Sequence, residues 1–198
     1  TYDRAGADGL LRGADLELLV RNQVQVLHCP ASGLKLAAGF CPVRTLAGAG
    51  INVALGTDGA ASNNTLDLFA EMRLAALLAK GSSGDPTALP AVTAVLMATR
   101  MGAQAMHIGD ITGSLEHGKH ADLILVDISP LHNAPRFRRD PQGAYAQLVY
   151  AAKSTDVSDL MVNGRWLFRE DRWLTVDFNA ARRELEQQHA ELMKRVKK

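Results

Sequence analysis

The segment NVALGTDGAASNN, Asn52 to Asn64, places a single acid after an apolar run. The run predicts a strand that ends just before Asp58, so its carboxylate is expected at the carboxyl end of that strand. α/β barrels and open sheets gather their functional groups at this end. A carboxylate there can bind a divalent metal ion through one oxygen and accept a proton from metal-bound water through the other. The alternative is that Asp58 only caps the following turn.

Polar residues near two predicted strand ends are further candidates for the same site. His28 ends the apolar part of VQVLHCP, and Ser32 follows in the next loop. Ser62 follows Asp58 within GTDGAASNN. His28 and Ser62 have structural alternatives, because a strand-end histidine is commonly hydrogen-bonded within the fold and Ser62 can cap the next helix.

Several other chemistries find no support in the sequence. The chain lacks the GxxxxGK[ST] and GxGxxG phosphate loops, the GxSxG nucleophile motif and the HxE…PCxxC zinc motif. The two cysteines, Cys29 and Cys41, form no CxxC pair and no disulfide framework. His117 and His120 have a suggestive spacing, but they precede a predicted strand in a turn, where a metal role is not favoured.

Composition indicates a globular protein with a sizeable core. Of the 198 residues 47% are hydrophobic, and the net charge is +1. Because no strongly basic face is implied, nucleic acid is not an expected partner. The apolar runs are shorter than a membrane span and no signal peptide opens the chain, so we expect a cytoplasmic protein without a membrane partner.

The order of predicted elements indicates two kinds of structure. Strands alternate with helices in the first part, which argues for a parallel sheet or barrel. Short strands with an Asn163-Gly164 turn follow and predict a small separate sheet, and an amphipathic helix ends the chain. The expected helices are 15–21, 43–49, 63–81, 90–106 and 179–198, and the expected strands are 24–30, 51–56, 121–129, the hairpin 160–168, and 172–177.

The sequence also resembles a known family. The stretch from LHCPASGLKL to LFAEMRLAALL is similar to the amidohydrolase superfamily, in particular to its 5′-methylthioadenosine/S-adenosylhomocysteine deaminase and chlorohydrolase-like branch. GSLEHGKHADLILVD and VNGRWLFREDRWLTVD resemble parts of the small β domain of these enzymes. The resemblance implies the C-terminal part of a (β/α)₈ TIM barrel in 1–112, part of a β-sandwich domain in 113–178, and a C-terminal helix in 179–198.

The resemblance assigns roles to the candidate residues. Asp58 matches the eighth-strand aspartate, which is metal ligand and general base in such enzymes. Ser62 matches a substrate-contacting position, and His28 and Ser32 match a strand-seven segment near the pocket. The complete enzyme would hold one divalent ion, zinc or iron. It would hydrolytically remove an amino group from a small purine-like substrate, and the alternative is a triazine- or guanine-type ring.

The sequence also departs from this family. It contains no HxH pair, no match to the fifth-strand histidine and none to the nearby glutamate. No histidine stands in GADGLLRG, where the sixth-strand histidine is expected, and Gly33 replaces a common asparagine. One carboxylate holds a metal weakly. We therefore expect a piece of a longer enzyme that is inactive alone, or a truncated non-catalytic remnant. Open barrel edges would favour a homo-oligomer.

Overall fold

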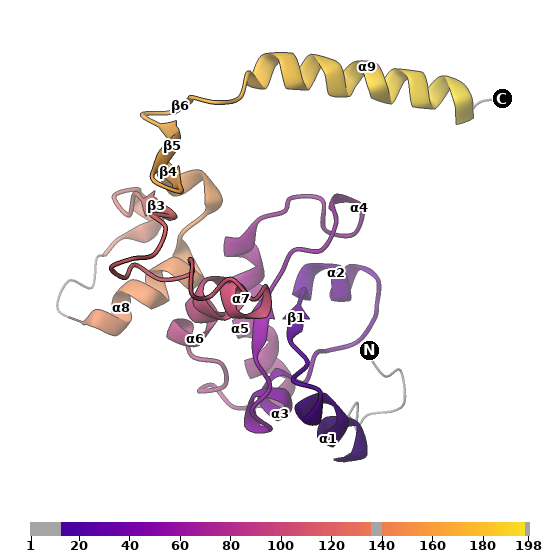
Figure 1. Ribbon diagram of the computed structural model, residues 1–198, viewed down its shortest axis with the longest axis vertical. Helices are drawn as coiled ribbons and strands as arrows, with labels where there is room; N and C mark the ends of the chain where they lie inside the picture. Colours follow the sequence, from indigo (N-terminus) through magenta and orange to yellow (C-terminus); the bar gives the residue numbers. More distant parts are fainter. Residues whose placement is uncertain (1–12, 136–139, 197–198) are drawn as a thin grey trace. The chain divides into compact units, whose positions relative to one another are not determined.

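The computed structural model describes residues 13–135 and 140–196. The chain divides into two compact units. The first extends to Lys119 and includes Asp127–Asp156, and the second consists of His120–Val126 and Val157–Lys198. Figure 1 colours the chain from indigo at its beginning to yellow at its end, and the two segments of each unit can be followed by that scale.

The first unit is built around two short parallel strands. β1 (Val26–His28) pairs in parallel with β2 (Val53–Leu55), with Val26 opposite Val53 and His28 opposite Leu55. This confirms the predicted parallel pairing, while the complete barrel stays a prediction. The other elements are α1 (Gly13–Arg21), α2 (Pro30–Lys35), α3 (Val43–Gly48), α4 (Ala60–Asn63), α5 (Leu68–Ser83), α6 (Ala91–Ala98), α7 (Arg100–Ala105), η1 (Leu131–Asn133), α8 (Pro141–Ala146), η2 (Gln147–Ala151) and η3 (Ser154–Asp156).

The core of this unit lies where helices cover β2. All three β2 residues are buried, and among the helices α6 and α7 contact the strand most extensively. Ala75 and Ala76 on α5 and Ala94 and Met97 on α6 are almost fully buried. Burial of such apolar surface is the main favourable term in folding. β1 differs from the buried strand that we expected, because the side chain of Leu27 is 56% exposed.

Three helix boundaries differ from the sequence predictions. Pro30 does not lead into a loop but begins α2, since proline suits a first helical position. The sequence offers Asn63, Asn64 or Thr65 as the cap of the helix that contains LDLFAEM. The structure caps α5 with Asp67 instead, whose Oδ1 accepts from the N–H groups of Phe69 and Ala70. The helix expected over 90–106 is interrupted at Thr99, whose hydroxyl donates to the Val95 carbonyl at 2.8 Å.

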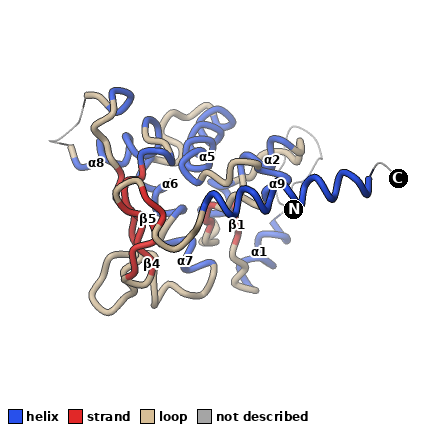
Figure 2. The backbone as a smooth tube through the Cα atoms, turned by 90° about the horizontal axis from the view of Figure 1, so that it is seen from above, coloured by secondary structure: helices blue, strands red, loops and turns tan. Residues whose placement is uncertain are grey.

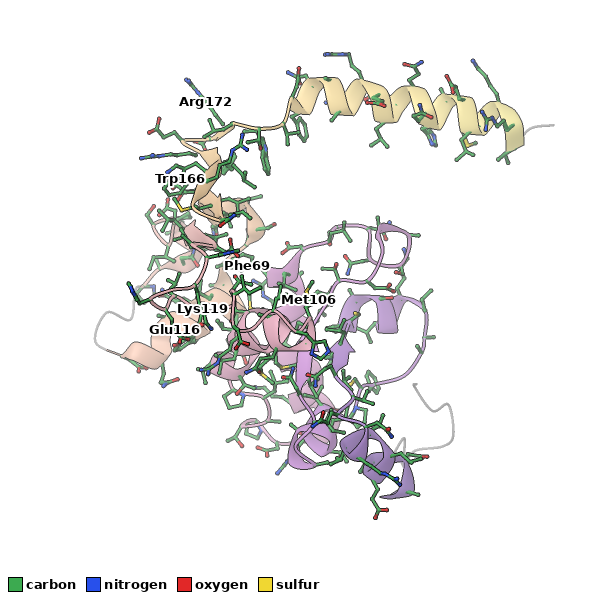
Figure 3. All side chains as sticks on the ribbon, in the orientation of Figure 1. Phe69, Met106, Glu116, Lys119, Trp166 and Arg172 are labelled. Carbon is green, nitrogen blue, oxygen red and sulfur yellow. The ribbon has the colours of Figure 1, made fainter. Side chains whose placement is uncertain are left out.

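Polar contacts fix the ends of the helical layer. On α5, Arg73 donates from Nε to the Val149 carbonyl at 3.2 Å and from a terminal nitrogen to the Ala152 carbonyl at 2.7 Å. Lys119 Nζ donates to the Gly109 carbonyl at 2.7 Å and lies 3.6 Å from Glu116. Figure 3 labels Lys119 and Glu116, which lie close together.

The second unit contains a four-stranded antiparallel sheet. Its order is β3 (Leu123–Val126), β4 (Val157–Val162), β5 (Arg165–Arg169) and β6 (Arg172–Trp173). Positive φ angles at Asn163 and Gly164 form the predicted turn between β4 and β5, which lie side by side in Figure 2. β6 is shorter than the predicted strand. α9 (Phe178–Val196) confirms the last predicted helix, and none of its residues is buried.

No helix among the described residues has both the length and the apolar character that crossing a membrane requires.

His28, the last residue of β1, lies inside the first unit. Its side chain is only 4% exposed and lines a narrow cavity with Pro30, Cys41, Ala75 and Leu78. The ring nitrogen Nδ1 has no hydrogen-bond partner among the described residues. Burial penalises the charged imidazolium and lowers the pKa of His28 to about 4.

We predict that His28 makes the stability depend on pH between its two pKa values. A histidine that is neutral when folded and has an ordinary pKa of 6.5 when unfolded favours unfolding as the pH falls from 6.5 to 4. The free energy of unfolding should fall by about 3 kcal/mol over this interval. Urea unfolding at several pH values should show a flatter profile for His28→Gln. The exposed His117→Gln should keep the wild-type slope, and an unchanged slope in His28→Gln would contradict the prediction.

We predict that Arg73→Met destabilises the first unit. The substitution removes donors from two carbonyls of buried residues, and a hydrogen bond to a charged group contributes about 1.5–3 kcal/mol. The expected loss in the free energy of unfolding is therefore about 2–3 kcal/mol, measured by urea denaturation. The matched control is Arg44→Met, because Arg44 is exposed and forms a surface ion pair with Asp85 at 3.2 Å. Arg44→Met should lower the free energy of unfolding by at most about 1 kcal/mol. Equal losses in the two variants would contradict the prediction.

Candidate functional site

The residues that follow the two strands meet at one end of the sheet. α2 begins directly after β1, and α4 begins shortly after β2. The two helices contact one another beyond the carboxyl ends of the strands (Figure 1). Between β2 and α4, Asp58 is exposed and has a φ of 61°, a left-handed conformation that is uncommon outside glycine. Such backbone strain clusters at functional sites and directs attention to this residue.

Two serines from different segments contact the Asp58 carboxylate. The hydroxyls of Ser32 on α2 and Ser62 on α4 each donate to Oδ2 of Asp58 at 2.7 Å. Ser32 is buried, Ser62 is half-buried, and the carboxylate itself stays open to solvent. The structure therefore brings together Ser32, Asp58 and Ser62, three of the four residues that the sequence singled out.

The hydrogen bonds keep the carboxylate ionised. The Ser32 hydroxyl, then the Ser62 hydroxyl and then the Gly59 N–H hold the pKa of Asp58 below its usual range. At neutral pH the group is thus an anion that can bind a cation or accept a proton. Gly59 is the N-cap of α4 and offers no side-chain cap, and the side-chain partners of the Asp58 carboxylate are the two serines.

The fourth candidate, His28, occupies a different position. Its carbonyl accepts the Gly56 N–H at 3.0 Å, which extends the pairing between the strand ends. Its ring lies in the cavity described above, which residues of α2 and α5 also line. His28 therefore packs between the elements that carry the site. Among the described contacts, none joins its ring to Asp58.

Two residues that sequence reasoning did not select strengthen the contact between the segments. Lys35 Nζ donates to the Ala61 carbonyl at 2.9 Å and to Asn64 Oδ1 at 2.6 Å, so it joins α2 to α4. Glu71 on α5 is 1% exposed and also contacts both segments. An acid on the apolar face of a predicted helix was the signal that could have revealed Glu71.

The described residues offer one plausible metal ligand at this site. A carboxylate oxygen such as that of Asp58 suits zinc and other divalent ions. Within 13–135 and 140–196, however, no three His, Cys, Asp or Glu side chains come close enough together to hold a metal ion. The segment 6–12, which covers most of the place expected for a sixth-strand histidine, lies outside the described residues. Asp58 thus fits the role of one ligand in a larger set.

Known proteins are similar to this chain in sequence and in fold. A 5-methylthioadenosine/S-adenosylhomocysteine deaminase of Moorella thermoacetica is 47% identical over 184 residues, which cover 93% of this chain and 40% of the relative. An adenosine deaminase structure from Xanthomonas campestris with bound zinc matches at a TM-score of 0.86 and 41% identity, covering 93% of this chain and 41% of the other. A zinc complex of atrazine chlorohydrolase from Arthrobacter aurescens matches at a TM-score of 0.75 and 28% identity. The match covers 86% of this chain and 37% of the other.

These relatives are considerably longer than the present chain. The chain spans about two fifths of the length of the Moorella deaminase and of the Xanthomonas structure. The family model described as "Amidohydrolase family" matches residues 5–167, which include both strands, the Asp58 site and most of the antiparallel sheet. The chain therefore belongs to the amidohydrolase family.

Proposed function

We propose that this chain forms the Asp58 part of the active site of a metal-dependent hydrolase that deaminates adenosine-like substrates. The observation that carries the proposal is the ionised Asp58 carboxylate, held by two serines at the carboxyl ends of parallel strands. Relatives named as 5-methylthioadenosine/S-adenosylhomocysteine deaminase and 5′-deoxyadenosine deaminase, both 47% identical, support the substrate class. The reaction would exchange the ring amino group for oxygen and release ammonia.

Asp58 has two roles in this proposal. One carboxylate oxygen would bind the divalent ion, and the carboxylate would take up a proton from the attacking water and pass it to the leaving amino group. The metal, zinc or iron, would supply Lewis-acid activation of that water. Because the pKa of Asp58 is held low, the carboxylate is in the form that binds a cation.

The serines would orient the carboxylate and contact the substrate. Ser62 is half-buried next to the exposed Asp58, so its hydroxyl is within reach of a bound ligand. Ser32 is buried and acts mainly through its hydrogen bond to Asp58. The described residues provide one ligand for the metal, and the proposal therefore requires further ligands beyond them.

A triazine-type substrate is the second candidate within the family. The zinc complex of atrazine chlorohydrolase supports it, at 28% identity and a TM-score of 0.75. The adenosine deaminase structure is more similar in both respects, with 41% sequence identity and a TM-score of 0.86, so we favour the adenosine-like substrate. A non-catalytic chain is the third reading, which the single metal ligand among the described residues supports.

Asp58→Asn should abolish most of the deaminase activity. It removes a ligand and a proton acceptor, and general acid–base catalysis alone contributes roughly 10²–10⁴-fold. Ammonia release from 5′-methylthioadenosine and from S-adenosylhomocysteine should be followed in the presence of zinc, with bound metal measured in parallel. Asp85→Asn, a surface control, should leave the rate unchanged. Activity that survives in Asp58→Asn contradicts the proposal, and a wild type that has neither metal nor turnover even when the further ligands are supplied supports the non-catalytic alternative.

Ser32→Ala should raise the pKa of the Asp58 carboxyl. The lost hydrogen bond stabilises the charged form, and Ser32 has the largest influence, so Ser62→Ala should raise it less. The two bonds favour the folded state above the ordinary pKa of 3.8, and this contribution disappears as the pH falls through the lower folded value. Carbon-13 NMR titration of the carboxyl measures both shifts.

The control for this titration is Thr87→Ala. Thr87 lowers the pKa of Asp85 through its hydroxyl and its backbone N–H. The substitution removes the hydroxyl bond, so it should raise the pKa of Asp85 and leave that of Asp58 unchanged. An Asp58 pKa that stays the same in Ser32→Ala would show that the serine is not a donor to the carboxylate in solution.

A further inference from the structure

Glu71 is a buried carboxylate that contacts both segments of the Asp58 site. It lies on α5 and is 1% exposed. Its Oε2 accepts the Ala31 N–H at 3.0 Å, and its Oε1 accepts from Asn63 Nδ2 at 2.7 Å. Both acceptors are occupied by donors that come from segments 32 residues apart in sequence, since Ala31 lies in α2 and Asn63 in α4.

The partners of Glu71 are the chain neighbours of the two serines. Ala31 directly precedes Ser32, and Asn63 directly follows Ser62. Asp58 accepts from the two serine hydroxyls, while Glu71 accepts from the residue beside each serine. Two carboxylates therefore hold the same pair of dipeptides, one through the serines and the other through their neighbours.

The Asn63 side chain is fixed in an orientation that suits this contact. Its Oδ1 accepts the Leu66 N–H at 2.8 Å and lies 3.3 Å from the Thr65 hydroxyl. The amide nitrogen is consequently directed to Glu71, and a reversed amide would lose its contacts on both sides. Asn63 is itself 8% exposed, so water offers little replacement for a lost bond.

The burial of Glu71 is costly if it only fills space. Within the described parts of the chain, no lysine, arginine or histidine forms an ion pair with it. A buried charge is destabilising unless it is hydrogen-bonded, and an apolar side chain of similar volume is often at least as stable. A buried carboxylate does, however, hold its partners in a defined geometry, because charge-assisted hydrogen bonds are short and directional.

We propose that Glu71 is a positioning residue that sets Ser32 and Ser62 against Asp58. It touches no reacting group and acts by holding Ala31 and Asn63. The consequence for catalysis rests on the proposed function of Asp58, whereas the geometric claim does not. Asp58 alone does not determine where the serines lie, since its exposed side chain would follow them if α2 and α4 moved.

The test is an exchange of the hydrogen-bonding groups between positions 71 and 63. Glu71→Gln places an amide N–H₂ where a donor already points, and Asn63→Asp places two carboxylates together. The double variant Glu71→Gln/Asn63→Asp restores the pattern, because the glutamine can accept from Ala31 and donate to the aspartate, whose other oxygen accepts from Leu66. The total charge of the pair is unchanged.

Crystal structures of the wild type and the variants measure the two serine–Asp58 distances directly. We expect both to be 2.7 Å in the wild type and restored in the double variant. At least one should exceed the hydrogen-bonding range of about 3.2 Å in each single variant. Where the chain turns over, kcat should fall about 10²-fold in the single variants with a smaller change in KM, and recover in the double variant. Glu184→Gln, an exposed change on α9, is the control.

The outcomes separate this proposal from the proposed function. Unchanged serine–Asp58 distances in a folded Glu71→Gln overturn the proposal, as does a double variant that is no better than the single ones. If the single variants fail to fold, a folded double variant with both distances restored supports the proposal and an unfolded one overturns it. If the wild type shows no turnover, the two distances still decide the role of Glu71, and full activity in Asp58→Asn counts against the proposed function only.

Discussion

The parallel pairing of β1 with β2 determines where the polar residues of this chain meet. Because the strands run in the same direction, their carboxyl ends lie at the same edge, and the segments that follow them come into contact. Ser32 and Asp58 are 26 residues apart in sequence and still form a 2.7 Å hydrogen bond. The helices α5, α6 and α7 bury β2 and keep this arrangement in place.

Polar contacts on two sides hold together the segments that form the site. Lys35 joins α2 to α4 from the solvent side, while Glu71 joins the same segments from the buried face of α5. The exposed Asp58 carboxylate thus rests on groups that have little freedom to move. A preorganised ligand of this kind loses less free energy on binding a metal or substrate than a flexible one.

Sequence patterns identified much of this arrangement and missed a definable part. The apolar runs predicted both strands, the Asn163-Gly164 pair predicted the turn, and the amphipathic pattern predicted the last helix. Ser32 and Ser62 were selected because they follow the two predicted strand ends. The missed features depend on tertiary context: the Asn63 amide donates to Glu71 and its Oδ1 accepts from Leu66, and α5 begins later in the chain with Asp67 as its cap. The direction of the His28 ring and the exposure of Leu27 likewise depend on neighbours that no local pattern specifies.

The central claim, that Asp58 is a metal ligand, is tested most directly by anomalous diffraction from crystals of the chain grown with saturating zinc. We predict an anomalous peak with an Asp58 carboxylate oxygen about 2.0–2.2 Å from the ion, the distance typical of zinc–carboxylate bonds. A map in which zinc is bound at other residues while Asp58 keeps only its serine partners would contradict the account.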